Sequence, residues 1–129
     1  MTPTLAFAAA FLVTLALLGV VAWSGTRAKR RVHIPAVLLA YVSLAVTIYY
    51  AYRLGDTLDL ASAGIITPIH LFLARAATLG LLVASALGIK TLFFPKSRRT
   101  HMKLAWFALG LVVLAAITGV IMVSLASPR

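Results

Sequence analysis

Four apolar stretches, each long enough to span a bilayer, constrain the fold of this chain more than any other feature of its sequence. A membrane-spanning helix needs about 20 predominantly apolar residues, and only helices or closed barrels satisfy their backbone groups in lipid. Charged residues separate the stretches, which cover residues 4–23, 34–52, 68–94 and 104–125. The sequence therefore predicts an all-α integral membrane protein, a four-helix transmembrane bundle that forms a single domain over residues 1–129.

The composition excludes a water-soluble domain. Of the residues, 63% are hydrophobic and 11% are charged, whereas about half and about a quarter are usual in soluble domains. The chain has 12 Lys and Arg against 2 Asp and Glu, a balance that in a soluble protein would suggest nucleic acid. A chain this apolar is not a nucleic-acid module, so the predicted partner is the lipid bilayer. Without cysteine, the chain forms no disulfide, thiolate cluster or covalently attached haem.

The placement of the charges predicts the orientation in the membrane. Two segments, one between the first and second stretches and one around the boundary of the third and fourth, hold nine basic residues: Arg27, Lys29, Arg30, Arg31, Lys90, Lys96, Arg98, Arg99 and Lys103. The opposite side carries Arg53 and Arg129 with both acids, Asp56 and Asp59. By the positive-inside rule the nine-residue side is cytoplasmic. We therefore expect a multi-pass protein of the bacterial inner membrane, with both termini on the outer (periplasmic) side.

The N-terminal stretch and the aromatic residues fit this topology. The first stretch lacks the basic start and the small-residue cleavage site of a signal peptide, so we expect it to be retained as a helix. Aromatic side chains prefer the headgroup level of a bilayer. Five of them lie near predicted interfaces, where they are expected to act as anchors: Trp23, Trp106, Tyr49, Tyr50 and Tyr52.

Small and polar residues indicate how the helices pack. Gly80, Ala84 and Gly88 form a small-residue stripe that allows a neighbouring helix to approach closely. On the second stretch, polar residues recur at helical spacing and are expected to face the bundle rather than lipid. They are Ser43, Thr47 and Tyr50.

The three histidines are the candidate cofactor ligands. His33 and His101 open the second and fourth helices at the cytoplasmic boundary, whereas His70 opens the third at the outer boundary. A b-type haem needs two imidazoles at one depth on facing helices. His33 and His101 meet that condition and are the predicted ligands of the haem iron. The alternative is that these boundary histidines are merely solvated or face lipid headgroups.

Small residues follow His101 at helical spacing. They are Ala105, Ala108, Val112, Ala115 and Gly119. One interpretation is that they leave room for a flat macrocycle beside the fourth helix. The other is that they let two helices pack closely, which is the commoner reason for such a run.

Arg75 is the one basic residue that the topology does not explain, because it lies inside the third predicted span, where a charge costs a few kcal/mol unless it snorkels or finds a partner. One hypothesis is that its side chain snorkels to the outer surface and pairs with Asp56 or Asp59. The other is that Arg75 and His70 together hold an anionic group near the outer face, such as a haem propionate or a quinone headgroup.

Enzymatic chemistry has little support in the sequence. There is no glycine-rich phosphate loop, no His-Glu-x-x-His motif and no Ser/His/Asp set, and both acids lie in one loop. We therefore predict no catalytic residues and no independent enzyme. The adjacent His101 and Met102 could contact copper, but one such pair is a weak pattern.

Over residues 31–125 the sequence resembles the CtaM-like family of small four-helix membrane proteins, which assist assembly of haem-copper cytochrome c oxidase. The matching motifs are Arg31-Val-His33, Tyr49-Tyr50-Ala-Tyr52-Arg53, Ile69-His70-Leu71, His101-Met-Lys-Leu104-Ala105 and Thr118-Gly119-Val120. The resemblance implies a membrane helper in oxidase maturation, with histidines at both faces that handle haem or copper. Where such proteins tend to have a histidine near the end of the second helix, this chain has Tyr52-Arg53-Leu54-Gly55. An outer pair with His70 therefore cannot form.

The layout is also similar to four-helix b-type cytochromes, in which three histidines would allow one bis-histidine haem. The predicted function is association with respiratory electron transfer, either in oxidase assembly or as the carrier of one b-type haem. The alternative is a non-catalytic structural subunit that packs against other membrane subunits of a respiratory or photosynthetic complex. A transporter is disfavoured, because the sequence shows neither broken helices nor an evident internal repeat.

Overall fold

The computed structural model describes residues 1–129 and is helical over most of its length. Its long helices are α1 (Pro3–Thr26), α2 (Arg30–Gly55), α3 (Ile66–Phe93) and α4 (Arg98–Leu125). The remaining elements are short: β1 (Leu58–Asp59), η1 (Leu60–Ala63), η2 (Pro95–Ser97) and β2 (Ser127–Pro128). All four long helices are long and apolar enough to cross a membrane, which confirms the prediction of four apolar helices of spanning length and indicates a multi-pass membrane protein.

The helices extend beyond the apolar stretches that predicted them. Helix α2 begins at Arg30 and α4 at Arg98, so basic residues form their first turns. His33, His70 and His101 consequently lie about one turn inside their helices rather than at the first residue. The physical reason is that an apolar run marks only the hydrocarbon layer, whereas helical hydrogen bonds continue through the interface, where long basic side chains reach water.

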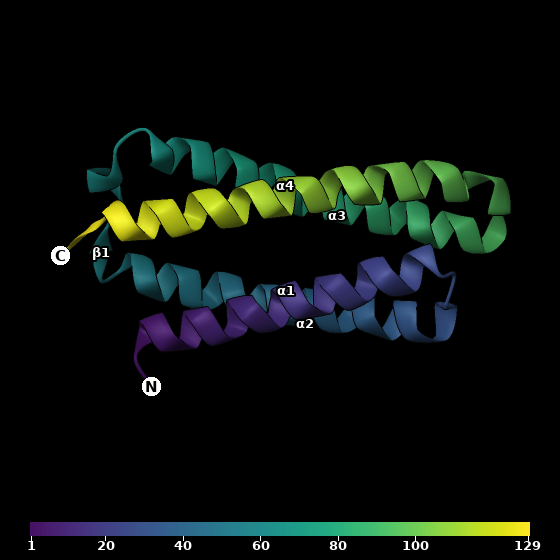
Figure 1. The fold of residues 1–129 in the computed structure, drawn as a ribbon, viewed down its shortest axis with the longest axis horizontal. Helices are drawn as coiled ribbons and strands as arrows, with labels where there is room; N and C mark the ends of the chain where they lie inside the picture. Colours follow the sequence, from purple (N-terminus) through teal and green to yellow (C-terminus); the bar gives the residue numbers. More distant parts are fainter. The chain divides into compact units, whose positions relative to one another are not determined.

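The chain divides into two compact units, each built on one pair of helices. The first unit comprises residues 1–59 with 128–129, and the second comprises residues 60–127. Figure 1 shows α1 beside α2 and α3 beside α4, each pair joined by a short connection. The chain's last two residues belong to the first unit, where the Arg129 N–H donates to the Thr57 carbonyl at 3.1 Å and β2 pairs with β1.

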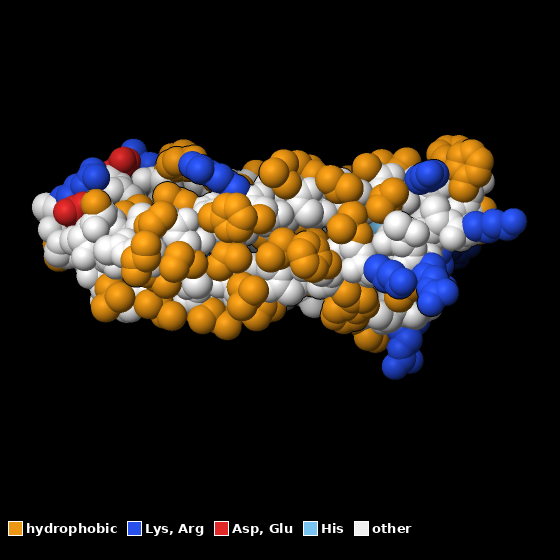
Figure 2. All heavy atoms as spheres, turned by 90° about the horizontal axis from the view of Figure 1, so that it is seen from above, with side chains coloured by type: hydrophobic (Ala, Val, Ile, Leu, Met, Phe, Trp, Pro, Cys, Tyr) orange, Lys and Arg blue, Asp and Glu red, His pale blue; other side chains and the backbone are white.

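Each hairpin has small residues inside and large apolar residues outside, the reverse of a soluble domain. The buried residues are mainly alanines and short polar residues, among them Ala36, Ala40, Ala77, Ala84 and Ala108. Large apolar side chains are exposed instead, such as Phe72 at 70% and Val120 at 63%. Hydrophobic side chains cover most of the face in Figure 2. This distribution suits a solvent of lipid tails, in which close backbone approach rather than water exclusion holds helices together.

Hydroxyl groups link α1 to α2 midway along the first hairpin. Thr14 Oγ1 lies 2.7 Å from Ser43 Oγ and 2.8 Å from Thr47 Oγ1. Each threonine hydroxyl also bonds a carbonyl of its own helix, that of Ala10 or of Ser43. Ser43 and Thr47 therefore face the neighbouring helix, as predicted. Tyr50 instead forms an edge-on ring contact with Tyr49 at 5.2 Å.

Replacing Thr47 by Val is expected to lower the free energy of unfolding by about 1 kcal/mol, since an interhelical hydrogen bond between hydroxyls in a membrane protein is worth roughly that. Denaturation of the detergent-solubilised protein by sodium dodecyl sulfate, followed by circular dichroism, measures the change. The matched control is Thr78→Val, because the Thr78 hydroxyl bonds only the Ala74 carbonyl of its own helix, at 2.9 Å. Equal losses in both variants would contradict the proposed interhelical contribution.

The small-residue stripe of α3 packs against α4, as predicted. A β-carbon added at Gly80 would lie 3.1 Å from the Ala108 β-carbon, and Ala108 has an exposed fraction of 0%. Ala84, one turn further along α3, is also buried. The small residues of α4 thus serve close packing at Ala108. The alternative interpretation, a slot left open for a macrocycle, is wrong at this position because α3 fills the space.

Candidate functional site

His101 contacts α3 in a specific way. Its Nδ1 atom lies 2.7 Å from the Ala84 carbonyl oxygen, which can only accept, so Nδ1 donates the proton. The ring lies over Gly88, where a β-carbon would stand 3.0 Å from His101 Cε1. A side chain at residue 88 would push the imidazole outward. Glycine at this position therefore permits the hydrogen bond.

His70, on α3, forms the same arrangement with α4 in the opposite direction. Its Nδ1 donates to the Ala115 carbonyl of α4 at 3.0 Å, and the Thr118 hydroxyl oxygen lies 3.3 Å from the same nitrogen. A β-carbon at Gly119 would lie 2.9 Å from His70 Cε1. Because α3 and α4 are antiparallel, His70 and His101 hold the hairpin at points far apart along it.

His33 forms the third copy of the arrangement, in the first hairpin. Its Nδ1 donates to the Val21 carbonyl of α1 at 3.0 Å, with Ser24 Oγ at 3.2 Å as a second acceptor. Ser24 is fully buried and its own hydroxyl donates to Val21. A β-carbon at Gly25 would lie 3.0 Å from His33 Cε1.

All three histidines follow one geometric rule. In each case the ring covers a glycine of the neighbouring helix, and Nδ1 donates to the carbonyl four residues before that glycine. A histidine–glycine clamp is our name for this unit, which occurs as His33 with Gly25, His70 with Gly119, and His101 with Gly88. The clamp fixes the tautomer, because a neutral imidazole that donates from Nδ1 carries its lone pair on Nε2.

This tautomer is the one that ligates metals through Nε2. Metal-binding histidines usually donate their other ring nitrogen to a backbone carbonyl or a carboxylate, which orients the ring. The clamps provide His33, His70 and His101 with such a hydrogen bond from Nδ1 to a backbone carbonyl. They also join helices, since each is an interhelical hydrogen bond. The geometry thus supports both a ligand role and a structural role.

Arg75 and His70 lie on different faces of α3. The His70 ring contacts α4, whereas the Arg75 side chain is exposed and forms no ion pair within its unit. The five-residue separation corresponds to about 140° around a helix with 3.6 residues per turn. The joint role of Arg75 and His70 in binding an anion stays a prediction.

No group of three or more His, Asp or Glu side chains gathers to hold a metal ion. A haem iron held by two axial ligands needs no such group, so this observation concerns only metal ions bound by protein side chains alone. Met102, the neighbour of His101, lines a basic groove at the start of α4 rather than the contact with α3.

The sequence interpretation did not pair the histidines with their glycine partners. One available signal was the repeat Arg30-Arg31-Val32-His33 and Arg98-Arg99-Thr100-His101, which opens the second helix of each hairpin. In both units the helix before this motif carries a clamp glycine within its last two turns, Gly25 in α1 and Gly88 in α3. The two hairpins are therefore internal repeats at their connecting ends, which corrects the interpretation that no repeat is present.

No protein-family model, curated protein or solved structure matches the chain in the comparisons made. The resemblance to the CtaM-like assembly factors thus rests on the motifs of the sequence. That resemblance stays a prediction.

Proposed function

We propose that this chain is a small integral membrane protein associated with respiratory electron transfer, with His33 and His101 as the axial ligands of one b-type haem. The observation that carries the proposal is the clamp geometry, in which Nδ1 of each imidazole donates to a backbone carbonyl at 3.0 Å or less. The donor chemistry fits haem, because neutral imidazole nitrogens are the ligands of b-type haem iron. When bound, the haem would supply one-electron oxidation and reduction.

The proposal includes the membrane topology. The four spans form a bundle in the inner membrane of a bacterium, with both termini on the outer side. The support is the asymmetry of charge, since the connections 27–31 and 90–103 hold nine basic residues, and both acids lie in the connection 56–59. His33 and His101 both follow basic pairs, Arg30-Arg31 and Arg98-Arg99, which supports the proposal that the two histidines lie at one depth in the membrane.

The protein's own residues have distinct tasks in this proposal. Gly25 and Gly88 admit the rings to the neighbouring helix, and the Val21 and Ala84 carbonyls hold Nδ1. Ser24 adds an acceptor to the His33 ring only. Assistance in assembly of a haem-copper oxidase, implied by the family resemblance, would use the same ligands to hold haem. Copper and quinone are the less favoured ligands.

The absorption spectrum of the protein purified from a haem-supplemented bacterial host tests this function. We expect a Soret band and, on reduction with dithionite, an α-band typical of b-type haem, at a ratio near one haem per chain. Pyridine haemochrome analysis gives the ratio. A colourless protein that is fully helical by circular dichroism would contradict the haem proposal.

The second candidate is a non-catalytic subunit that packs against other membrane subunits of a respiratory or photosynthetic complex. The same clamps favour it, because an imidazole that already fastens two helices has a structural role without any cofactor. Under this candidate the isolated protein is colourless and copurifies with a larger complex after mild solubilisation. A coloured monomer purified without partners would exclude it.

A further inference from the structure

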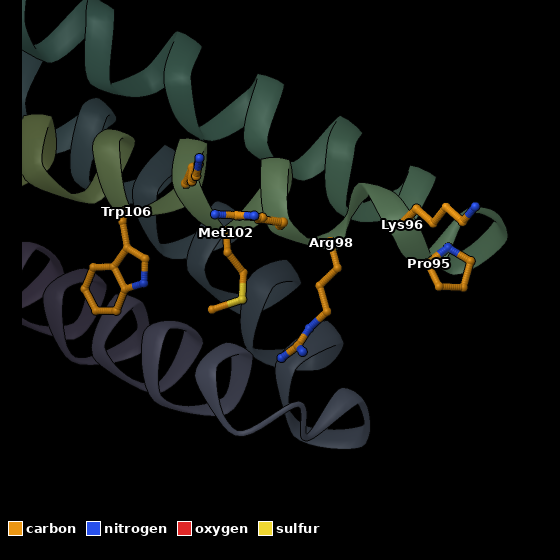
Figure 3. A pocket seen from close by; sticks show the side chains of 7 residues that line it. Pro95, Lys96, Arg98, Met102 and Trp106 are labelled. Carbon is orange, nitrogen blue, oxygen red and sulfur yellow. The ribbon is translucent and has the colours of Figure 1, made fainter.

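A groove at the start of α4 has a composition unlike the rest of the second unit. Its lining comes from η2 and the first two and a half turns of α4: Pro95, Lys96, Arg98, Arg99, Met102, Lys103 and Trp106. Its volume is about 450 Å³, and it is open to the surface. Figure 3 shows that the Arg98, Met102 and Trp106 side chains project from one side of α4. We call this surface the basic groove.

The basic groove concentrates positive charge without any counter-charge in its own unit. Lys96, Arg98, Arg99 and Lys103 contribute four cations. The only acids of the chain, Asp56 and Asp59, belong to the first unit, so residues 60–127 contain no carboxylate side chain. Four cations close together repel one another unless an anion lies between them. The start of α4, which no side chain caps, adds the positive end of its helix dipole.

The groove also has an apolar side, which distinguishes it from a site for a small soluble anion. Met102 and Trp106 follow Arg98 at intervals of four residues and therefore lie beneath it along one helix face. The Trp106 side chain is 54% exposed, and tryptophan prefers the level where headgroups meet acyl chains. Arg98 and Arg99 thus lie in the first turn of the helix, Lys103 and Met102 lie in the second turn, and Trp106 lies deepest along the span.

We propose that the basic groove binds the phosphodiester headgroup of an anionic phospholipid, with Arg99 and Lys103 contacting the phosphate and Met102 and Trp106 contacting the upper acyl chains. Basic pockets at the ends of membrane helices recognise acidic headgroups in this way. Arg98 and Arg99 lie nearest the headgroup level and Trp106 lies deepest, and a long lysine side chain such as that of Lys103 extends toward the headgroups. A phosphate free in solution would gain nothing from the apolar half of the groove.

Trp106 provides the measurement, because the chain has two tryptophans and Trp23 lies in α1. The variant Trp23→Phe leaves Trp106 as the single fluorophore. It is reconstituted in nanodiscs of phosphatidylcholine that contain increasing fractions of brominated phosphatidylglycerol or of brominated phosphatidylcholine. Bromine quenches tryptophan on contact. We expect the anionic lipid to quench Trp106 at a lower fraction, with a relative binding constant on the order of tenfold, given two direct cationic contacts.

Substitution of the cations tests the assignment of the contacts. Arg99→Gln with Lys103→Gln is expected to bring the ratio of the two binding constants close to one. The control pair Arg30→Gln with Arg31→Gln removes the same charge from the start of α2, outside the groove, and is expected to leave the ratio unchanged. All four side chains are exposed, so neither pair disturbs a buried contact.

Three results would overturn the proposal. A ratio near one in the unsubstituted groove would show that it does not prefer anionic lipid. An equal loss of preference in the control pair would assign the effect to net charge rather than to the groove. Recovery of fluorescence with millimolar inorganic phosphate, but not with chloride at the same ionic strength, would identify free phosphate as the ligand. The haem spectrum is a separate measurement, so failure here leaves the proposed function standing.

Discussion

Asparagine in place of His33 or His101 is expected to abolish the b-type haem spectrum while leaving the helical hairpins as stable as in the parent protein. The asparagine amide nitrogen occupies nearly the position of histidine Nδ1 and donates as that atom does, but asparagine has no counterpart of Nε2. It therefore keeps the hydrogen bond to the Val21 or Ala84 carbonyl and removes the proposed iron ligand. Absorption spectra and denaturation curves of the same samples measure the two effects.

The matched control is His70→Asn, which alters the clamp of His70 with Gly119 and neither of the two proposed iron ligands. We expect it to retain the full haem spectrum, because the hydrogen bond from residue 70 to Ala115 is preserved and the ligand pair is untouched. Loss of haem in all three variants to the same degree would show that the spectrum depends on the clamps as packing elements. Retention of haem in His33→Asn and His101→Asn would refute this ligand pair.

The helices could be predicted from the sequence because lipid leaves few alternatives to a helix of about 20 residues. Apolar runs identified all four, and the stripe at Gly80, Ala84 and Gly88 identified the face of α3 that meets α4. The ends were less predictable. Arg30 and Arg98 were expected outside the helices, yet they belong to the first turns of α2 and α4. Hydropathy identifies only the apolar part of a helix and gives no indication of the turns that lie in the membrane interface.

The clamps could not be predicted from the same patterns, because they depend on the register of two antiparallel helices. His70 and Gly119 are 49 residues apart and meet only because the α3–α4 connection sets which turns face each other. The position of each histidine in the sequence predicted its depth in the membrane but not the residue of the neighbouring helix that it contacts. The repeated Arg-Arg-x-His motif at 30–33 and 98–101 was the local signal of the two clamps at the connecting ends. The structure shows that each of these histidine rings covers a glycine of the neighbouring helix.

The small residues of α4 illustrate a different limit of the sequence. In the sequence, Ala108 and Gly119 were compatible both with a cofactor slot and with close packing. A small residue leaves space beside a helix, and either a cofactor or a neighbouring helix can occupy that space. In the structure Gly80 fills it at Ala108, and His70 fills it at Gly119. The basic groove could not be predicted either. In the sequence its basic residues indicated only the membrane topology, whereas the structure shows that Met102 and Trp106 lie on the same side of α4 as Arg98 and form an apolar side of the groove.

Leucine at Gly80 is expected to destabilise the second hairpin by about 3 kcal/mol, the upper part of the range for overpacking a close contact. A β-carbon at this position already lies 3.1 Å from the Ala108 β-carbon and 3.6 Å from its Cα, and the Cα belongs to the backbone of α4 and cannot rotate away. The three further carbons of leucine would have to separate the two helices. That separation would also lengthen the His70 and His101 hydrogen bonds across the same interface.

Gly110→Leu is the control that isolates packing from helix propensity. Both substitutions replace glycine by leucine inside a long helix, so each gains nearly 1 kcal/mol of helix propensity. Nothing lies within 4 Å of a β-carbon at Gly110, and its leucine therefore meets no such obstacle. We expect Gly110→Leu to unfold at or above the denaturant concentration of the parent protein and Gly80→Leu far below it. If the two variants unfolded together, the α3–α4 contact at Ala108 would not be the one that holds this hairpin closed.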